Sequence, residues 1–183
     1  MGMIRSLLIG LLTLGLLACG ATKQSVSSSS KNTSTVKVRK AAVWSSSITK
    51  RCREVDSLII NAAERHDLDR GLIAGIIRVE SAFQPKAKSH VGARGLMQVM
   101  PANGRALKCG NLNNPSANIE CGAKVLKGFL KYYKNNVIYA LSGYNAGFRM
   151  PNKARKAKGL PKNYWYVERV LSARTAYLRH GCG

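Results

Sequence analysis

The sequence is short of acidic residues. Its 183 residues include 8 Asp and Glu against 30 Lys and Arg, and the formal net charge is +22. Such a charge predicts a polyanionic partner, namely nucleic acid, an anionic membrane surface or a cell-wall polymer that carries carboxylates and phosphates. A basic surface that is only solvated gives the same total, so the charge alone does not choose between these interpretations.

The sequence also lacks the alternation of apolar and polar residues that is typical of β-strands, and it contains no internal repeat. Its apolar residues recur at helical spacing instead, as in the series Val55, Leu58, Ile59, Ala62 and Ala63. With 45% hydrophobic residues the chain has enough apolar material for one core. We therefore predict a single, mostly α domain of about 130 residues.

Local signals divide this domain into helices. A second helix is predicted from its cap, Asp69, to a stop before Pro85, and a short third one from Pro101 through Leu107. We expect the next helix to be capped by Asn118. Two more are predicted from the apolar stripes within residues 137–144 and 167–178.

The N-terminus carries the pattern of an export signal. The apolar stretch after Arg5 is too short for a comfortable membrane span, which needs about 20 residues. Its length and flanks are typical of a secretory signal. It ends in Leu16-Leu17-Ala18-Cys19, which resembles a bacterial lipobox, so we expect residues 1–18 to be removed and Cys19 to carry lipids. The alternative is an ordinary signal with a chance Cys.

Residues 19–50 are predicted to be a tether between the lipidated Cys19 and a domain at residues 51–183. The segment is rich in Ser and Lys and has no acidic residue, so it cannot bury enough apolar surface to fold alone. Gly20, rather than Asp, follows Cys19. The resemblance to lipoproteins of Gram-negative bacteria then implies the periplasmic face of the outer membrane.

The chain has no CxxC or HxxxH spacing, and its three His are scattered, so we expect no metal site and no cofactor. Four Cys remain when Cys19 is set aside, and an even number in an exported chain suggests two disulfides. Three connectivities exist. We favour Cys109–Cys121, which closes a short local loop, and Cys52–Cys182, which ties the ends of the domain together.

Glu80 stands out among the few acidic residues because it follows an apolar stretch. On a helix, Ile73, Ile76 and Ile77 share its face. A carboxyl on an apolar face is costly to charge, so it tends to keep its proton near neutral pH, as a general acid must. The alternative is a Glu at the helix end that is solvated or paired with Arg78.

Four short motifs, together with Val99-Met100-Pro101, Asn114-Pro115, Asn118-Ile119 and Gly122, follow one another in a characteristic order. The four are Glu80-Ser81, Gly92-Ala93-Arg94-Gly95-Leu96-Met97-Gln98, Tyr144-Asn145-Ala146-Gly147 and Tyr166-Val167. In this order and spacing they resemble the catalytic domain of the bacterial lytic transglycosylases, the soluble-lytic-transglycosylase family with the goose-type-lysozyme fold. The resemblance covers about residues 55–177.

The resemblance implies a role for each motif residue. Glu80 would be the catalytic acid and base, Ser81 would orient it or the substrate, and Tyr166 would point its hydroxyl at the acid. The other motif residues would bind the glycan: Gln98 by hydrogen bonds to the sugar or the acid, Met97 by lining the cleft, and Tyr144 and Asn145 by holding the substrate near the cleaved bond.

Some of these residues have an alternative, purely structural interpretation. The sequence also departs from the family pattern at two places. Met97, Val167 and Tyr144 also fit helical or core packing. Gly143 stands where the family usually has Ala before the Tyr-Asn-Ala-Gly motif. Lys162-Asn163 stands where the family often has Glu-Thr, which removes a carboxylate from the cleft region and adds a cation.

The scarcity of acids argues for a single catalytic carboxylate. Ordinary glycosidases use two, but Asp69 lies about 16 Å from Glu80 along a helix. Glu64, Asp67 and Glu168 are not excluded by sequence. In the resembled family the C6 hydroxyl of N-acetylmuramic acid attacks the anomeric carbon, which gives a 1,6-anhydro product and needs no second carboxylate.

The expected partners are peptidoglycan glycan strands, the membrane through the lipid anchor, and a secretion or conjugation machinery. Sugars would stack on some of the aromatic residues Tyr132, Tyr133, Tyr164 and Trp165. The rival functions are a goose-type lysozyme that hydrolyses the same bond and a non-catalytic wall-binding component of an envelope-spanning machine. Export, disulfides and the lack of a binding motif argue against nucleic acid.

Overall fold

The computed structural model describes residues 44–183, so the expected signal at 1–18, the lipidation site Cys19 and most of the 19–50 tether lie outside the described residues. The described part is mostly helical and has no strand beyond isolated bridge pairings in one loop, which confirms the predicted fold class. The helices are α1 (Ser46–His66), α2 (Arg70–Ser81), α3 (Pro101–Ala106), α4 (Pro115–Tyr132), α5 (Val137–Ala146), α6 (Arg149–Lys156) and α7 (Tyr164–His180). Helix α1 thus begins a few residues before the expected domain boundary at residue 51.

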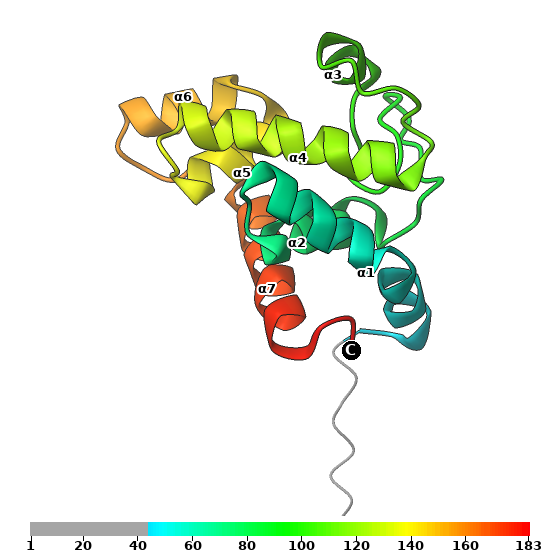
Figure 1. The fold of residues 1–183 in the computed structure, drawn as a ribbon. Coiled ribbons are helices and arrows are strands. Elements are labelled where there is room, and N and C mark those ends of the chain that lie inside the picture. Colours follow the sequence, from blue (N-terminus) through cyan, green and yellow to red (C-terminus); the bar gives the residue numbers. More distant parts are fainter. Residues whose placement is uncertain (1–43) are drawn as a thin grey trace, which may run out of the picture. The chain divides into compact units, whose positions relative to one another are not determined.

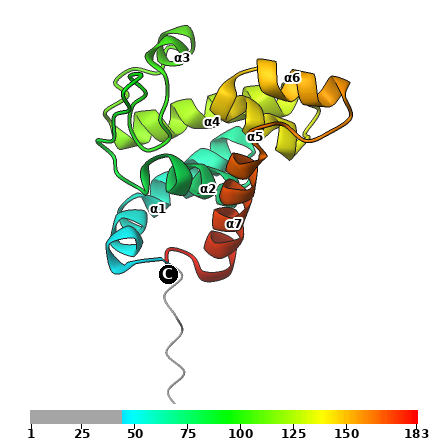
Figure 2. The same cartoon turned by 180° about the vertical axis from the view of Figure 1, so that it is seen from behind.

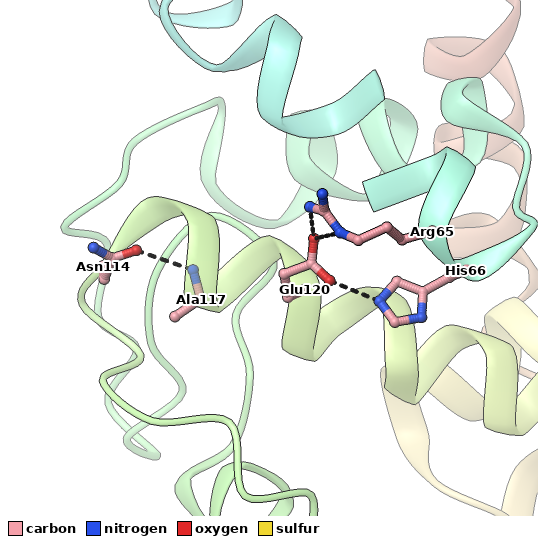
Figure 3. Close-up of polar contacts among 5 residues, drawn as sticks. All are labelled: Arg65, His66, Asn114, Ala117 and Glu120. Atoms are coloured by element: carbon pink, nitrogen blue, oxygen red, sulfur yellow. Dashed lines mark hydrogen bonds and ion pairs between the residues drawn. The ribbon is translucent and has the colours of Figure 1, made fainter. Parts of the chain in front are cut away.

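The caps of α2 and α4 show where the local signals were correct and where one was wrong. Asp69 caps α2, as predicted, and its Oδ1 accepts a hydrogen bond from the Leu72 N–H at 3.1 Å. Helix α4 begins earlier than predicted, because its cap is Asn114, whose Oδ1 accepts from the Ala117 N–H at 3.0 Å (Figure 3). Asn118 is therefore no cap but a buried residue inside the helix.

Helices α2 and α7 pack along each other and form the centre of the core. The close approach is possible because Gly75 of α2 has no side chain. A Cβ at that position would lie 2.6 Å from the carbonyl oxygen of Val170 in α7. Since the two helices pack in this way, the C-terminal turn of α2 and the N-terminal turn of α7 lie next to each other, as the Glu80–Tyr166 hydrogen bond shows.

Helix α4 lies across the rest of the domain (Figures 1 and 2). Helix α3 and the loops around it lie beside its N-terminal half, and α5 and α6 lie at its C-terminal end. The loop that carries Met97 is attached to α4 by Asn118. The side-chain amide of Asn118 accepts a hydrogen bond from the Met97 N–H at 2.8 Å and donates hydrogen bonds to the carbonyls of Arg94 and Leu112.

Two disulfides cross-link residues 44–183. They join Cys109 to Cys121 and Cys52 to Cys182, the two pairs that the sequence analysis favours. The second bond ties α1 to the residues after α7 and therefore holds the two ends of the domain together. None of the helices in residues 44–183 is both long enough and apolar enough to cross a membrane.

Candidate active site

Glu80 lies in the last turn of α2 and is part-buried. Ile73, Ile76 and Ile77, the residues predicted to share its face, are all completely buried. This burial raises the pKa of the Glu80 carboxyl, and a hydrogen bond from Tyr166 offsets part of the rise. No ion pair between Glu80 and Arg78 occurs among the described residues, so the paired alternative does not apply.

Tyr166 supplies the hydrogen bond to Glu80. It lies in the first turn of α7, only 1% of its surface is exposed, and its hydroxyl donates to Glu80 Oε1 at 2.7 Å. Burial, with the nearby carboxyl of Glu80, raises the pKa of the Tyr166 phenol well above its usual value. The hydroxyl therefore keeps its proton and acts as a donor across the neutral pH range.

Ser81 and Met97 support the site from inside. The Ser81 Oγ lies 2.8 Å from the carbonyl oxygen of Leu96 and 3.1 Å from that of Ile77, so it links the end of α2 to the Met97 loop. The Met97 side chain is completely buried, and a Cβ at Gly122 of α4 would overlap it. Both observations favour a packing and positioning role over direct contact with substrate.

Gln98 has a left-handed backbone conformation, with φ of 47°. Its side-chain amide forms hydrogen bonds within the loop that carries it. Nε2 donates to the carbonyls of Ala87 at 3.1 Å and Gly95 at 2.9 Å. Because these bonds use both N–H groups, Oε1 is the atom of the Gln98 amide that is left to accept a hydrogen bond from a ligand.

Tyr144 lies near Glu80 but donates elsewhere. Its hydroxyl donates to the carbonyl oxygen of Met97 at 2.8 Å, which joins α5 to the Met97 loop. Burial raises the pKa of the Tyr144 phenol well above its usual value, and the charge of Glu80 adds to the shift. The structure therefore brings Tyr144, Tyr166 and Glu80 together, as the motifs predict.

Asn145 is held by a residue that the sequence analysis did not single out as functional. Asn163 is 5% exposed, and its Nδ2 donates to Asn145 Oδ1 at 2.9 Å. The Ser142 hydroxyl in turn donates to Asn163 Oδ1 at 2.6 Å. Asn163 lies where the sequence departs from the family's Glu-Thr, and a polar residue directly before α7 is the signal that could have identified it.

The aromatic residues divide between core and surface. Tyr133 is buried, whereas Trp165 is 54% exposed and packs edge-on against Tyr166, with ring centroids 6.0 Å apart. Tyr132 is also exposed, but it packs against Tyr133 and Phe148 at the end of α4. Trp165 is thus the exposed aromatic ring that adjoins the Glu80–Tyr166 pair.

No second carboxylate acts on Glu80, because the causes of its raised pKa are burial and the Tyr166 hydrogen bond, with no contribution from a neighbouring acid. The other acidic residues have partners of their own or are exposed. Glu120 accepts hydrogen bonds from Arg65 and His66 (Figure 3). The rest are Asp67, paired with Lys127; Asp69, paired with Arg174; Asp56, bonded by Tyr177; and the exposed Glu54, Glu64 and Glu168.

Comparison with known proteins identifies relatives of this chain. The transglycosylase of Enterobacteria phage PRD1 is 39% identical over 55% of this chain and 37% of its own length. The soluble lytic murein transglycosylase of Salmonella typhimurium is 34% identical over 64% of this chain and 22% of its own. The chain therefore spans between about a fifth and two fifths of the length of these relatives.

A solved structure shares the fold as well. The lytic transglycosylase Slt of Pseudomonas aeruginosa, solved as an inactive mutant with Gln in place of one Glu, superposes with a TM-score of 0.60. The sequence identity is 28%, and the match covers 68% of this chain and 24% of that one. The family model described as the transglycosylase SLT domain matches residues 57–166, more than half of the chain, and the chain therefore belongs to that family.

Proposed function

We propose that the protein is a peptidoglycan lytic transglycosylase that cleaves the β-1,4 bond between N-acetylmuramic acid and N-acetylglucosamine without water. Glu80 acts alone as acid and then as base, and the product ends in a 1,6-anhydro sugar. The observation that carries the proposal is the part-buried Glu80, hydrogen-bonded by Tyr166, with every other acidic residue exposed or bound elsewhere.

The chemistry follows from the protonation of Glu80. Because burial favours the neutral carboxyl, Glu80 has a proton to give to the glycosidic oxygen as the bond to the anomeric carbon breaks. The C6 hydroxyl of the same sugar then attacks that carbon, and the Glu80 carboxylate accepts its proton. Intramolecular attack has a large proximity advantage, so no activated water is required.

Tyr166 gives the two oxygens of the Glu80 carboxyl different roles. Its hydroxyl occupies Oε1, which leaves Oε2 to carry the transferred proton. The same hydrogen bond stabilises the carboxylate that remains after the first proton transfer. The Asn163-supported Asn145 and the exposed Trp165 ring then hold the neighbouring sugars.

We further propose that the enzyme is exported and anchored through lipidated Cys19 at the periplasmic face of the outer membrane, with the residues between Cys19 and the start of α1 as its tether. The export signal and lipobox pattern of residues 1–19 support this location. The expected partner is the glycan strand itself, together with a secretion or conjugation machinery that needs a local opening in the wall.

The first test replaces the acid. Glu80→Gln keeps the shape of the side chain but cannot transfer the proton, so wall cleavage is expected to fall by about 100-fold or more. The assay is release of soluble fragments from purified peptidoglycan by the chain from Cys19 onward. Glu168→Gln, at an exposed position of α7, is the matched control and retains activity. Full activity in a folded Glu80→Gln variant contradicts the proposal.

Mass spectrometry of the released fragments separates the rival functions. Anhydro ends are expected. Reducing ends, heavier by one water, would instead identify a hydrolytic lysozyme, and binding of peptidoglycan without any release would identify a non-catalytic wall-binding component.

A further inference from the structure

A cationic hollow lies between α2 and α7, apart from the Glu80–Tyr166 pair. It has a volume of about 390 Å³ and lies between the last turns of α2 and the middle of α7. We call it the arginine hollow. Its lining consists of Trp44, Arg78, Val79, Arg169, Ser172, Ala173 and Ala176.

The arginine hollow is distinct from the catalytic site although both involve α2. Arg78 and Glu80 are two residues apart, which on an α-helix turns their side chains about 200° away from each other. Arg169 lies three residues after Tyr166, so its side chain is displaced by nearly one turn along α7, away from the catalytic pair. The catalytic mechanism uses none of the residues that line the hollow.

The positive charge in the hollow is not neutralised by any described residue. Neither Arg78 nor Arg169 forms an ion pair within residues 44–183, and the buried Nε of Arg78 has no hydrogen-bond partner there. Burial, then the charges of Arg169 and Arg51, lower the pKa of Arg78. Arg78 is part-buried, and its buried Nε–H without an acceptor is costly, so it calls for a partner that residues 44–183 do not provide.

The lining of the arginine hollow also offers the hydrogen-bond donors that a bound anion needs. The guanidinium groups offer planar, paired N–H donors that fit a carboxylate or a phosphate, and Ser172 adds a hydroxyl. No acidic residue lines the hollow to compete with such a ligand. Trp44 and Ala176 form an apolar wall for the uncharged part of the ligand.

We propose that the arginine hollow binds an oxyanion, a carboxylate or phosphate group, between the guanidinium groups of Arg78 and Arg169. The ligand joins α2 to α7 through residues that the catalytic pair does not use. It is a group separate from the glycan at Glu80, so the proposal stands whether or not the chain cleaves peptidoglycan.

Isothermal titration calorimetry on the chain from Cys19 onward tests the proposal with three probes. They are inorganic phosphate, an N-acetylated Ala-Ala dipeptide with a free carboxylate, and the same dipeptide as its amide. We expect the amide not to bind. Binding of phosphate alone or of the dipeptide acid alone identifies which oxyanion the hollow takes, and failure of both overturns the proposal.

Two exposed arginines of α7 provide a matched pair of variants, since neither substitution touches the core. Arg169→Gln is expected to weaken oxyanion binding at least 10-fold, whereas Arg179→Gln, in the last turn, leaves it unchanged. Equal losses in both variants would mean that the anion is attracted by the overall charge of the protein, and that result overturns the proposal.

Arg78→Met provides an independent readout by thermal melting. The variant removes the part-buried cation and its unsatisfied Nε–H, so we expect it to melt no lower than the wild type when no anion is present. The oxyanion raises the melting temperature of the wild type by mass action but not that of Arg78→Met. An equal rise in both proteins overturns the proposal.

Discussion

At the scale of single residues, two opposing effects set the pKa of Glu80. Burial raises it, and the hydrogen bond from Tyr166 lowers it by favouring the carboxylate. Since the folded-state pKa is raised on balance, folding favours the protonated form, and this contribution to stability is lost as the pH rises through the folded pKa. In the proposed mechanism, the same balance keeps a proton available for catalysis at pH values above the usual pKa of a glutamate.

Removal of the Tyr166 hydroxyl tests this balance. In Tyr166→Phe the burial of Glu80 is unopposed, so the pKa of Glu80 rises and the acid stays protonated to higher pH. A hydrogen bond to a charged group contributes about 1.5–3 kcal/mol, which corresponds to about one to two pKa units. We therefore expect the alkaline limb of the pH profile of kcat/KM to move upward by about one unit or more.

The control for this profile is Tyr139→Phe, because the Tyr139 hydroxyl donates to the carbonyl of Gly159 rather than to Glu80. Its alkaline limb should coincide with that of the wild type. An alkaline limb that stays in place or moves downward in Tyr166→Phe would show that Tyr166 does not tune the acid.

At the scale of elements, the packing of α2 on α7 determines whether Glu80 and Tyr166 meet. The two residues come from the facing ends of these helices, and Gly75 sets how closely the helices approach. A shift of either helix therefore changes the distance between the acid and its hydrogen-bond donor, even when the shift starts far from both.

Gly75→Ala is expected to push α2 and α7 apart. The new Cβ would lie 2.6 Å from the carbonyl oxygen of Val170, and a backbone atom cannot move aside as a side chain can. We expect a loss of about 1–3 kcal/mol in the free energy of unfolding, measured in urea, and a fall in kcat.

Gly128→Ala in α4 is the matched substitution for this experiment. A Cβ there meets nothing within 4 Å, and Gly128 is exposed. The change should stabilise the protein by about 0.5–1 kcal/mol, because Ala loses less conformational freedom than Gly in a helix. If the two variants have the same stability, close packing at Gly75 is not what holds the helices in place.

At the scale of the whole molecule, the two disulfides close loops of very different length. Cys52 and Cys182 are separated by 130 residues, and Cys109 and Cys121 by 12. The long loop spans nearly all of the described chain and includes all of the helices from α2 to α7. Closure of that loop therefore restricts the unfolded chain far more than closure of the local one.

Removal of each disulfide by paired Cys→Ala substitution should reflect this difference. In the chain-entropy model the Cys52–Cys182 bond contributes about 5 kcal/mol and the Cys109–Cys121 bond about 3 kcal/mol. Urea unfolding of the two double variants measures both values on the same protein. A larger loss for the Cys109–Cys121 pair would show that native-state packing outweighs loop closure here.

How far the sequence predicted the fold depends on how local each signal is. Asp69 was identified correctly because its capping hydrogen bond reaches only to Leu72. Asn118 was assigned wrongly as a cap, because the same residue type four positions earlier, Asn114, caps the helix and Pro115 follows it. The role of Asn118, a bridge to the Met97 loop, depends on a segment 21 residues away that periodicity does not detect.

The sequence by itself determined the helical fold class, the number of cysteines available for disulfides and the apolar stretch that makes Glu80 unusual. These properties depend on residues within a few positions of one another, since helix periodicity and capping are local. The family resemblance, rather than periodicity or capping, implied that Tyr166 points its hydroxyl at Glu80, 86 residues away. Only the tertiary structure decided that Asn163 holds Asn145 and that Arg78 and Arg169 share a hollow without an acid. Such meetings depend on how distant segments pack, and local patterns do not encode them.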